Sequence, residues 1–407
     1  MTTKQQTPQL RFTGFSEDWV QKKLVDEVNF FSGLTYTPND VVDKSGTLVL
    51  RSSNVQNGAI ALGDNVYVKS EVVNSQNVEV GDSIVVVRNG SRNLIGKHAM
   101  ITKPMSKTVI GAFMTGIRAP IPSFFNTLLD TQEFNDEVSK NLGATINQIT
   151  GGMFKAMSFY LPQSDEQTAI GNLFQNIDQT ITLQRRKHQQ TQTLKKSLLS
   201  KMFPKKGQVQ PEIRLEGFSG DWVEKKLTDE VTFFSGLTYT PNDVIDKSGT
   251  LVLRSSNVQN GYIALNDNVY VNSKVVNSQN VKVGDIIVVV RNGSRNLIGK
   301  HAMIIKPMSN TVIGAFMTGI RAPAPSFFNA LLDTQEFNDE VSKNLGATIN
   351  QITGGMFKKM EFYIPKHEEQ TAIGQFFKQL DDTLSLQAQR LKILDNLKKA
   401  LLAKMFV

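Results

Sequence analysis

The chain contains two copies of one sequence in tandem. Residues 30–58 return as residues 233–261 with Val42 replaced by Ile245 as the only change, and residues 84–101 return unaltered as 287–304. A repeat of about 200 residues is far longer than the 20 to 50 residue unit of a solenoid, so each copy is predicted to fold as a module of its own. We therefore expect two equivalent modules and a target that presents the same feature twice.

Composition limits the class of protein. With 407 residues, 40% hydrophobic and 20% charged, the chain is long enough for two globular cores. The formal net charge of +8 is modest and compatible with a polyanionic partner. The absence of cysteine excludes disulfides and thiolate metal sites, and the four histidines are too scattered for a metal cage. No signal peptide and no run of 18 apolar residues is found, which predicts a soluble cytoplasmic protein.

Each copy reads as a mixed α/β module. Matched opening segments, residues 8–20 and 211–223, precede short β-type runs at 48–51, 83–87 and 98–102 that are separated by turn residues. From Ser123 to Leu142 the apolar spacing becomes helical, which predicts one helix capped by that serine and ended before Gly143.

A long stretch with helical periodicity closes each copy. In the first copy, residues 166–203 would span roughly 57 Å as one helix, more than a single module needs to cover itself. The alternative is a helix that packs only on its own module. The apolar stripes are formed by Ile170, Leu173, Phe174, Ile177 and Ile181, then Leu194, Leu198, Leu199 and Met202, and in the second copy by Ile373, Phe376, Phe377, Leu380 and Leu384, then Leu391, Leu394, Leu397, Leu401 and Met405.

The short connection between the copies favours a spacer. We predict an α+β fold in which two α/β modules are joined by two long antiparallel α-helices, coiled-coil-like, pseudo-twofold and circularly closed, with Val407 returning toward Met1. The predicted segments are a first module at 1–162, a first helix at 163–203, a linker at 204–217, a second module at 218–365 and a second helix at 366–407.

Twofold symmetry suggests a duplex DNA target, because two equal reading heads match inverted half-sites about one helical turn apart. The strongest candidate loop is RNGSRNLIGKH, residues 88–98 and 291–301, which follows a buried-type strand. Arginine suits guanine, asparagine suits adenine, and serine or lysine suits phosphate. A polar turn that contacts nothing is the alternative, and it stays open.

Two further segments are candidates. GLTYTPND with LRSSN, residues 33–40 and 50–54, offers hydroxyls, an aromatic ring and an arginine, although such residues equally form turns. GATINQITGG, residues 143–152, offers close backbone approach or merely a tight turn. The predicted DNA-contacting residues are Thr35, Tyr36, Arg51, Ser52, Arg88, Asn89, Ser91, Arg92, Asn93, Lys97, Thr145, Asn147 and Gln148, and their equivalents Thr238, Tyr239, Arg254, Ser255, Arg291, Asn292, Ser294, Arg295, Asn296, Lys300, Thr348, Asn350 and Gln351.

Enzymatic motifs are missing from the sequence. Residues 90–98 imitate a phosphate-binding loop, but five residues rather than four separate Gly90 from Gly96, and His98 replaces the hydroxyl that would hold magnesium. No nucleophile elbow, zinc-ligand pair, dinucleotide fingerprint or adenine-methyltransferase tetrapeptide is present. We expect no catalytic, cofactor or metal site in this chain.

The chain resembles the specificity subunit of type I restriction-modification systems. The resemblance rests on PQLRFTGFSEDWVQKKL, on VGDSIVVVRNG and on GATINQITGGMFKAMSFYLPQSDEQTAIGNLF, all of which recur in the second copy. It implies two target-recognition domains held apart by antiparallel helices, each domain reading half of a bipartite DNA sequence. It also implies two modification subunits that carry S-adenosylmethionine for N6-adenine methylation, and restriction subunits that use ATP and Mg²⁺. The chain itself would be non-catalytic.

The two sets of candidate loops are identical, whereas members of that family usually carry two unlike recognition domains. We therefore predict an interrupted palindrome as the target. Two alternatives stay open: a bivalent scaffold that binds no DNA, and the equivalent recognition subunit of a fused type II enzyme.

Overall fold

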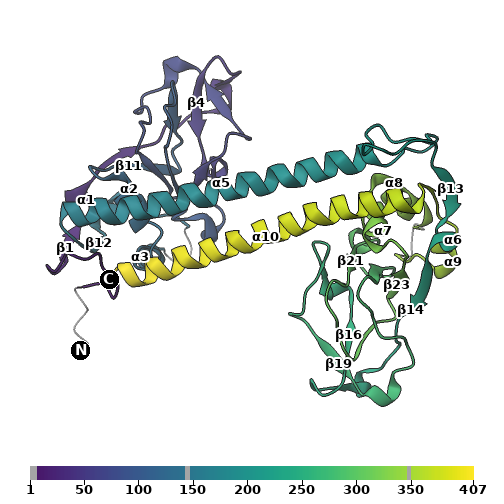
Figure 1. The fold of residues 1–407 in the computed structure, drawn as a ribbon. Helices are drawn as coiled ribbons and strands as arrows, with labels where there is room; N and C mark the ends of the chain where they lie inside the picture. The colour runs from purple at the N-terminus through teal and green to yellow at the C-terminus, as the bar shows by residue number, and fades with distance from the viewer. Residues whose placement is uncertain (1–6, 143–146, 346–349) are drawn as a thin grey trace. The chain divides into compact units, whose positions relative to one another are not determined.

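The computed structural model describes residues 7–142, 147–345 and 350–407 (Figure 1). The chain forms two compact units, one made of Met1–Arg185 with Gln389–Val407 and the other of Arg186–Ala388. Each unit thus contains one globular module, the first half of its own long helix and the last half of the other long helix. Each long helix is divided between the two units. These units therefore do not correspond to the predicted recognition modules, whose limits stay predictions.

The module of the first unit is built on two four-stranded sheets. One sheet is antiparallel in the order β2-β11-β8-β9, and the other has the order β10-β4-β7-β3 with a parallel β10/β4 pair. A small β1/β12 pair joins the start of the module to its end. The strand bounds are β1 Val20–Lys23, β2 Asn29–Ser32, β3 Val41–Val42, β4 Thr47–Leu50, β5 Val55–Gln56, β6 Ala59–Ile60, β7 Val66–Val68, β8 Ser83–Val86, β9 His98–Met100, β10 Thr108–Ile110, β11 Met114–Arg118 and β12 Ser158–Leu161.

The second unit repeats this topology. Its four-stranded sheets have the orders β14-β23-β20-β21 and β15-β19-β16-β22. The strand bounds are β13 Val223–Lys226, β14 Thr232–Ser235, β15 Val244–Ile245, β16 Thr250–Leu253, β17 Val258–Gln259, β18 Tyr262–Ile263, β19 Val269–Val271, β20 Ile286–Val289, β21 His301–Met303, β22 Thr311–Ile313, β23 Met317–Arg321 and β24 Glu361–Ile364. The predicted β-type runs are confirmed to within two residues, as the repeat of buried Ile and Val in β8 and β20 requires.

The prediction of one helix from Ser123 to Leu142 is wrong, because two helices meet there. α2 begins with Pro122 at its first position, so Ser123 is not the cap, and the chain turns at Leu129 before α3. Thr131 is the N-cap of α3, because its hydroxyl accepts a hydrogen bond from the backbone N–H of Phe134 at 3.2 Å. A second helix therefore begins here. The short helices are α1 Leu24–Glu27, α2 Pro122–Leu128, α3 Gln132–Asn141, α4 Gly151–Ala156, α6 Leu227–Glu230, α7 Pro325–Leu332, α8 Gln335–Asn344 and α9 Gly354–Lys358.

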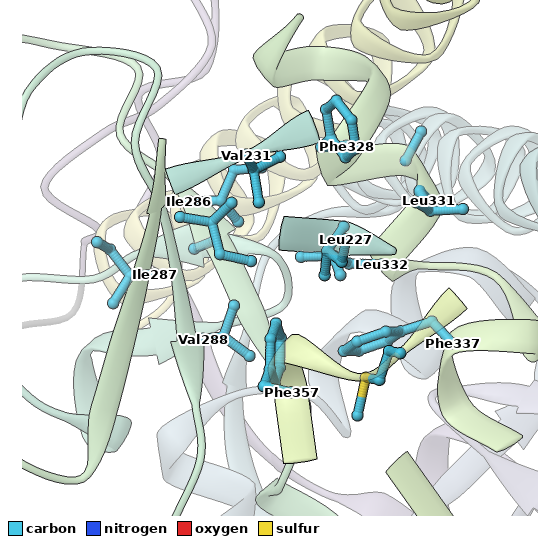
Figure 2. Packing of buried hydrophobic residues seen from close by; sticks show 14 of the residues in the cluster. Leu227, Val231, Ile286, Ile287, Val288, Phe328, Leu331, Leu332, Phe337 and Phe357 are labelled. Atoms are coloured by element: carbon cyan, nitrogen blue, oxygen red, sulfur yellow. The ribbon is translucent and has the colours of Figure 1, made fainter. Parts of the chain in front are cut away.

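Each unit has one main hydrophobic core. In the second unit the β20 side chains Ile286 to Val288 pack with the aromatic rings of α7, α8 and α9 (Figure 2). Phe328, Phe337 and Phe357 are almost fully buried there. A smaller cluster in each module, formed by Leu34, Val49, Val68 and Val109 in the first, lies on the second sheet. Each module therefore has a main core and a separate small cluster on its second sheet.

The two long helices are α5 Ser164–Met202 and α10 His367–Met405 (Figure 1). They run antiparallel in each unit: within the first, Asp178 and Arg185 meet Lys398 and Asp395. In the second, Thr191 and Lys195 likewise meet Gln387 and Asp381. The antiparallel prediction is confirmed.

The stripes on the helices pack differently from the prediction. Ile170, Phe174, Ile177 and Ile181 join the core of their own module as well as meeting the other helix. Leu194, assigned to the buried stripe, is 51% exposed, because Leu199 and Met202 occupy the buried face near the end of α5. The helix therefore leaves apolar side chains uncovered by its own chain.

The described residues near the two ends of the chain contact each other within the first unit. Arg11 of the opening segment donates two hydrogen bonds of 2.7 Å to the buried carboxylate of Glu166 in the first turn of α5, and Arg214 repeats this with Glu369. The Leu10 N–H donates to the Lys404 carbonyl at 2.8 Å, which closes the chain on itself. Neither long helix, nor any other helix in the described part of the chain, is long and apolar enough to cross a membrane.

Candidate nucleic-acid interface

Three of the predicted segments meet at one end of β8. Asn89 donates from Nδ2 to Ser52 Oγ at 3.0 Å, and Asn147 donates from Nδ2 to the Gly90 carbonyl at 3.0 Å. Arg88 and Gln148 form an antiparallel bridge. The second copy repeats each contact with Asn292 and Ser255, Asn350 and Gly293, and Arg291 and Gln351. Segments that are 37 and 57 residues apart therefore form one polar surface in each unit.

Several of the predicted side chains hold this surface together. The Asn89 side chain also accepts from the Ser91 N–H at 3.0 Å, so its amide is engaged on both atoms. Arg51 pairs with Asp64 at 2.9 Å, and Arg254 pairs with Asp267 at the same distance. These contacts match the structural alternative left open for the loops. Direct base contact by these groups stays a prediction.

Other predicted side chains point outward from the same loop. Arg88, Ser91, Arg92, Asn93 and Lys97 are all exposed, as are the equivalent residues of the second copy. A short 3-10 turn over Arg92–Leu94 carries the middle of this group. Cationic and hydroxyl groups on one loop provide the chemistry for phosphate and base-edge contacts.

The GLTY segment borders this surface through its backbone. The Leu34 N–H donates to the Ile110 carbonyl at 2.7 Å, and the next residue, Thr35, is exposed. Tyr36 packs its ring on the small cluster around Val49 and is half-buried. Thr238 and Tyr239 occupy the same places in the second unit. Thr145 and Thr348 lie outside the described residues.

One side chain at this surface was not singled out from the sequence. Phe113 ends the turn that precedes β11 and is 52% exposed, and the guanidinium carbon of Arg88 lies 5.0 Å from its ring centroid. Phe316 is equally exposed, with Arg291 at 4.9 Å. The available signal was the motif GAFM at 111–114, which returns unaltered at 314–317 between two β-type runs.

A charged cluster joins each module to the long helices. Lys398 Nζ lies 2.6 Å from carboxylate oxygens of both Asp130 and Asp178, and His98 Nε2 lies 3.4 Å from Asp130. Lys195 repeats the arrangement with Asp333 and Asp381.

Burial and neighbouring charge act in opposite directions on these groups. Burial acts to raise the pKa of Asp130, but the hydrogen bond and charge of His98 together with Lys398 outweigh it and hold the pKa at about 2. Burial dominates at Asp178, whose pKa is raised despite Lys398. The pKa of Lys398 is also raised, because the attraction of the two carboxylates exceeds the effect of burial. The cluster therefore fixes the helix pair to the module by charge.

Two differences between the copies lie away from the polar surface. Tyr262, where the first copy has Ala59, donates its hydroxyl to the Asp381 carbonyl at 2.7 Å, and burial raises its pKa to about 12. Glu79, where the second copy has Lys282, pairs with Arg118 at 2.8 Å. Both positions serve structural contacts. In the described ranges, no group of three or more acidic, histidine or cysteine side chains could hold a metal ion.

The chain belongs to the family of the type I restriction modification DNA specificity domain, whose family model matches residues 16–193 and 219–396. The resemblance found in the sequence is confirmed, and the chain is a type I restriction-modification specificity subunit. It is 28% identical to the EcoKI specificity subunit of Escherichia coli (strain K12), over 96% of this chain and 89% of that protein. It is 22% identical to the StySPI specificity subunit of Salmonella potsdam over the same shares.

Solved structures show the same fold. The S subunit of a type I restriction-modification system from M. genitalium matches with a TM-score of 0.68 at 14% identity, covering 98% of this chain and 99% of that one. A chain from a structure concerned with complex assembly and conformational transition of the type I R-M system matches with a TM-score of 0.50 at 17% identity, covering 95% and 97%. At these identities the likeness establishes the fold alone.

Proposed function

We propose that this subunit reads an interrupted palindrome in double-stranded DNA, each unit reading one half. The observation that carries the proposal is that the two polar surfaces have the same residues and the same contacts. Identical surfaces select identical half-sites. In each unit the long helices run antiparallel, and the helix that begins in one unit ends in the other. This arrangement supports half-sites that are inverted rather than repeated in one direction.

The same proposal assigns partners. The chain positions two adenine-N6 methyltransferase subunits, which supply S-adenosylmethionine, and restriction subunits that use ATP and Mg²⁺ join for cleavage, while the chain itself catalyses nothing. Exposed leucines on the long helices support a docking role. Leu183 and Leu194 on α5 are 64% and 51% exposed, and Leu386 and Leu397 on α10 are 56% and 46% exposed. A spacing of 11 residues places each pair on one face of its helix.

The methylated motif tests the reading function. Cells that carry this chain with its methyltransferase subunits should show one methylated sequence whose two halves are reverse complements across a fixed gap. Two unrelated half-sites would refute the palindrome, and the absence of any methylated motif would refute the reading function.

Arg88 and Arg291 test the proposed surface. Arg88→Ala should weaken specific binding by about 1 to 3 kcal/mol, and the double variant with Arg291→Ala should cost about twice that if the two sites act independently. The control is Lys103→Ala, because Lys103 is exposed and follows β9 at the other end of the β8/β9 pair. If neither arginine affects affinity or sequence preference, the loop is structural.

The competing class is a bivalent adaptor that binds no DNA. The assembled complex should bind duplex DNA with an affinity that falls steeply with salt, since contacts to phosphates release counterions. An adaptor would show no such slope.

A further inference from the structure

Phe113 lies where the candidate DNA-reading segments come together. Its carbonyl accepts from the N–H groups of Val87 and Arg88, at 3.0 and 3.2 Å. The preceding residues bind the other segments, because Gly111 N–H donates to the Leu50 carbonyl at 2.8 Å and Ala112 N–H donates to the Leu34 carbonyl at 2.9 Å. The turn is thus fixed by hydrogen bonds to three predicted segments, which gives the ring a rigid base.

The ring itself is left in solvent. Among the phenylalanines of the described residues, only Phe113 and its equivalent Phe316 are exposed, each at 52%. Phe124, Phe125 and Phe134, which follow Phe113 in the sequence, are buried. A large apolar ring that is exposed twice, at the same place in two rigid turns, is suited to contact with a partner rather than to packing within the chain.

The neighbouring arginine indicates the kind of partner. The Arg88 guanidinium lies over the ring of Phe113, so a flat apolar surface and a cation stand side by side. DNA bases offer matching groups, because their faces and the thymine methyl accept an aromatic ring while guanine and phosphate accept an arginine. Within the described residues, Arg88 forms no ion pair with a carboxylate, in contrast to Arg51 with Asp64 and Arg118 with Asp82.

We infer that Phe113 and Phe316 contact bases directly, with each ring packed on apolar base atoms beside the adjacent arginine. The inference rests on the proposed DNA-reading function and assigns to it a residue pair that contributes affinity without charge. The ring and the arginine therefore make two separable contributions at one surface. The ring contributes to sequence preference, and the arginine contributes to both sequence preference and salt dependence.

The test uses the complex of the full chain with its methyltransferase subunits and a duplex carrying the methylated motif found for the unaltered complex. Phe113→Ala should weaken binding to this duplex by about tenfold or more, the range found when a base loses an aromatic contact. Binding to a duplex without the motif should change much less. The slope of log affinity against log salt should stay unchanged, since the ring neutralises no phosphate, whereas Arg88→Ala should lower it.

Matched variants make the result specific. Phe316→Ala should affect the other half-site equally, and Phe113→Leu, which keeps apolar bulk, should fall between the parent and Phe113→Ala. The control is Val80→Ala, because Val80 is 56% exposed and precedes β8 at the end away from Arg88. Thermal unfolding should be the same for all four variants.

Three outcomes would overturn the inference. Unchanged binding by Phe113→Ala to a duplex that the parent complex recognises would exclude base contact by the ring. An equal loss for Val80→Ala would make the effect non-specific. Loss of the methyltransferase subunits with DNA binding retained would make the ring a protein contact. If the unaltered complex recognises no duplex at all, the proposed function fails instead.

Discussion

Lys398 is predicted to stabilise a module that begins almost 400 residues earlier in the chain. Its ammonium lies 2.6 Å from both Asp130, in the turn after α2, and Asp178 on α5, so Lys398→Met leaves two carboxylates facing each other. The perturbation removes a positive charge and keeps a side chain of similar length. We expect the first unit to lose stability and the second to keep it.

The size of the loss follows from burial. Removing one partner of a buried ion pair costs about 3 to 5 kcal/mol. Lys398 is 18% exposed, but Asp130 and Asp178 are 29% and 39% exposed, so water screens part of the remaining repulsion. We expect about 2 to 3 kcal/mol. For a unit of about 200 residues, this lowers Tm by roughly 4 to 12 °C.

Calorimetry of the full chain measures this effect. Lys195→Met removes the equivalent contact to Asp333 and Asp381, and should lower Tm of the second unit by a similar amount. Lys399→Met, on an exposed position of the same helix, is the control. Adding Asp178→Asn to Lys398→Met should restore part of the loss. A change of less than about 1 °C for Lys398→Met, or an equal change for Lys399→Met, would refute the reasoning.

Three further perturbations test the fold. The pKa of Asp130 falls from 3.8 to about 2 on folding, so its carboxylate stabilises the fold above pH 3.8, and this stabilisation is lost as the pH falls toward 2. Asp130→Asn should therefore make stability less dependent on pH between these two values. An unchanged acid-unfolding profile would contradict this expectation. Gly116→Ala would place Cβ 2.0 Å from the Phe31 ring and should cost about 1 to 3 kcal/mol in urea denaturation, whereas Gly63→Ala, with no atom within 4 Å, should cost far less. Phe406→Ala should cost about 3 to 5 kcal/mol in the same assay, because the ring packs on Trp19; a loss below 1 kcal/mol would exclude this contact as a core element.

Much of the architecture was predictable from local signals. The repeat predicted two equivalent modules, β-branched runs predicted β4 and β8, and the long apolar periodicity predicted α5 and α10. The break between α2 and α3 was missed because apolar spacing continues across it, while the cap by Thr131 depends on a single hydroxyl. Periodicity reports which face is buried, and it does not report a short interruption.

The candidate surface was predictable only in part. Each loop was identified from its own composition, but the contact of Asn89 with Ser52 joins positions 37 residues apart, and no local pattern encodes it. Phe113 was missed for a related reason. In a single sequence, an exposed phenylalanine is indistinguishable from the buried Phe124, because exposure depends on what the rest of the fold leaves uncovered.

The distribution of differences between the two copies bears on the palindrome. Six of the 25 positions from 59 to 83 differ from their equivalents, whereas none differs from 84 to 101 or from 147 to 152. The variable stretch includes Ala59, whose equivalent Tyr262 donates a hydrogen bond to α10, and Glu79, which pairs with Arg118. The invariant stretches form the polar surface. Differences between the copies therefore fall mostly in turns and loops outside the polar surface and are absent from the predicted reading loops, which is the pattern expected if both units must select the same half-site.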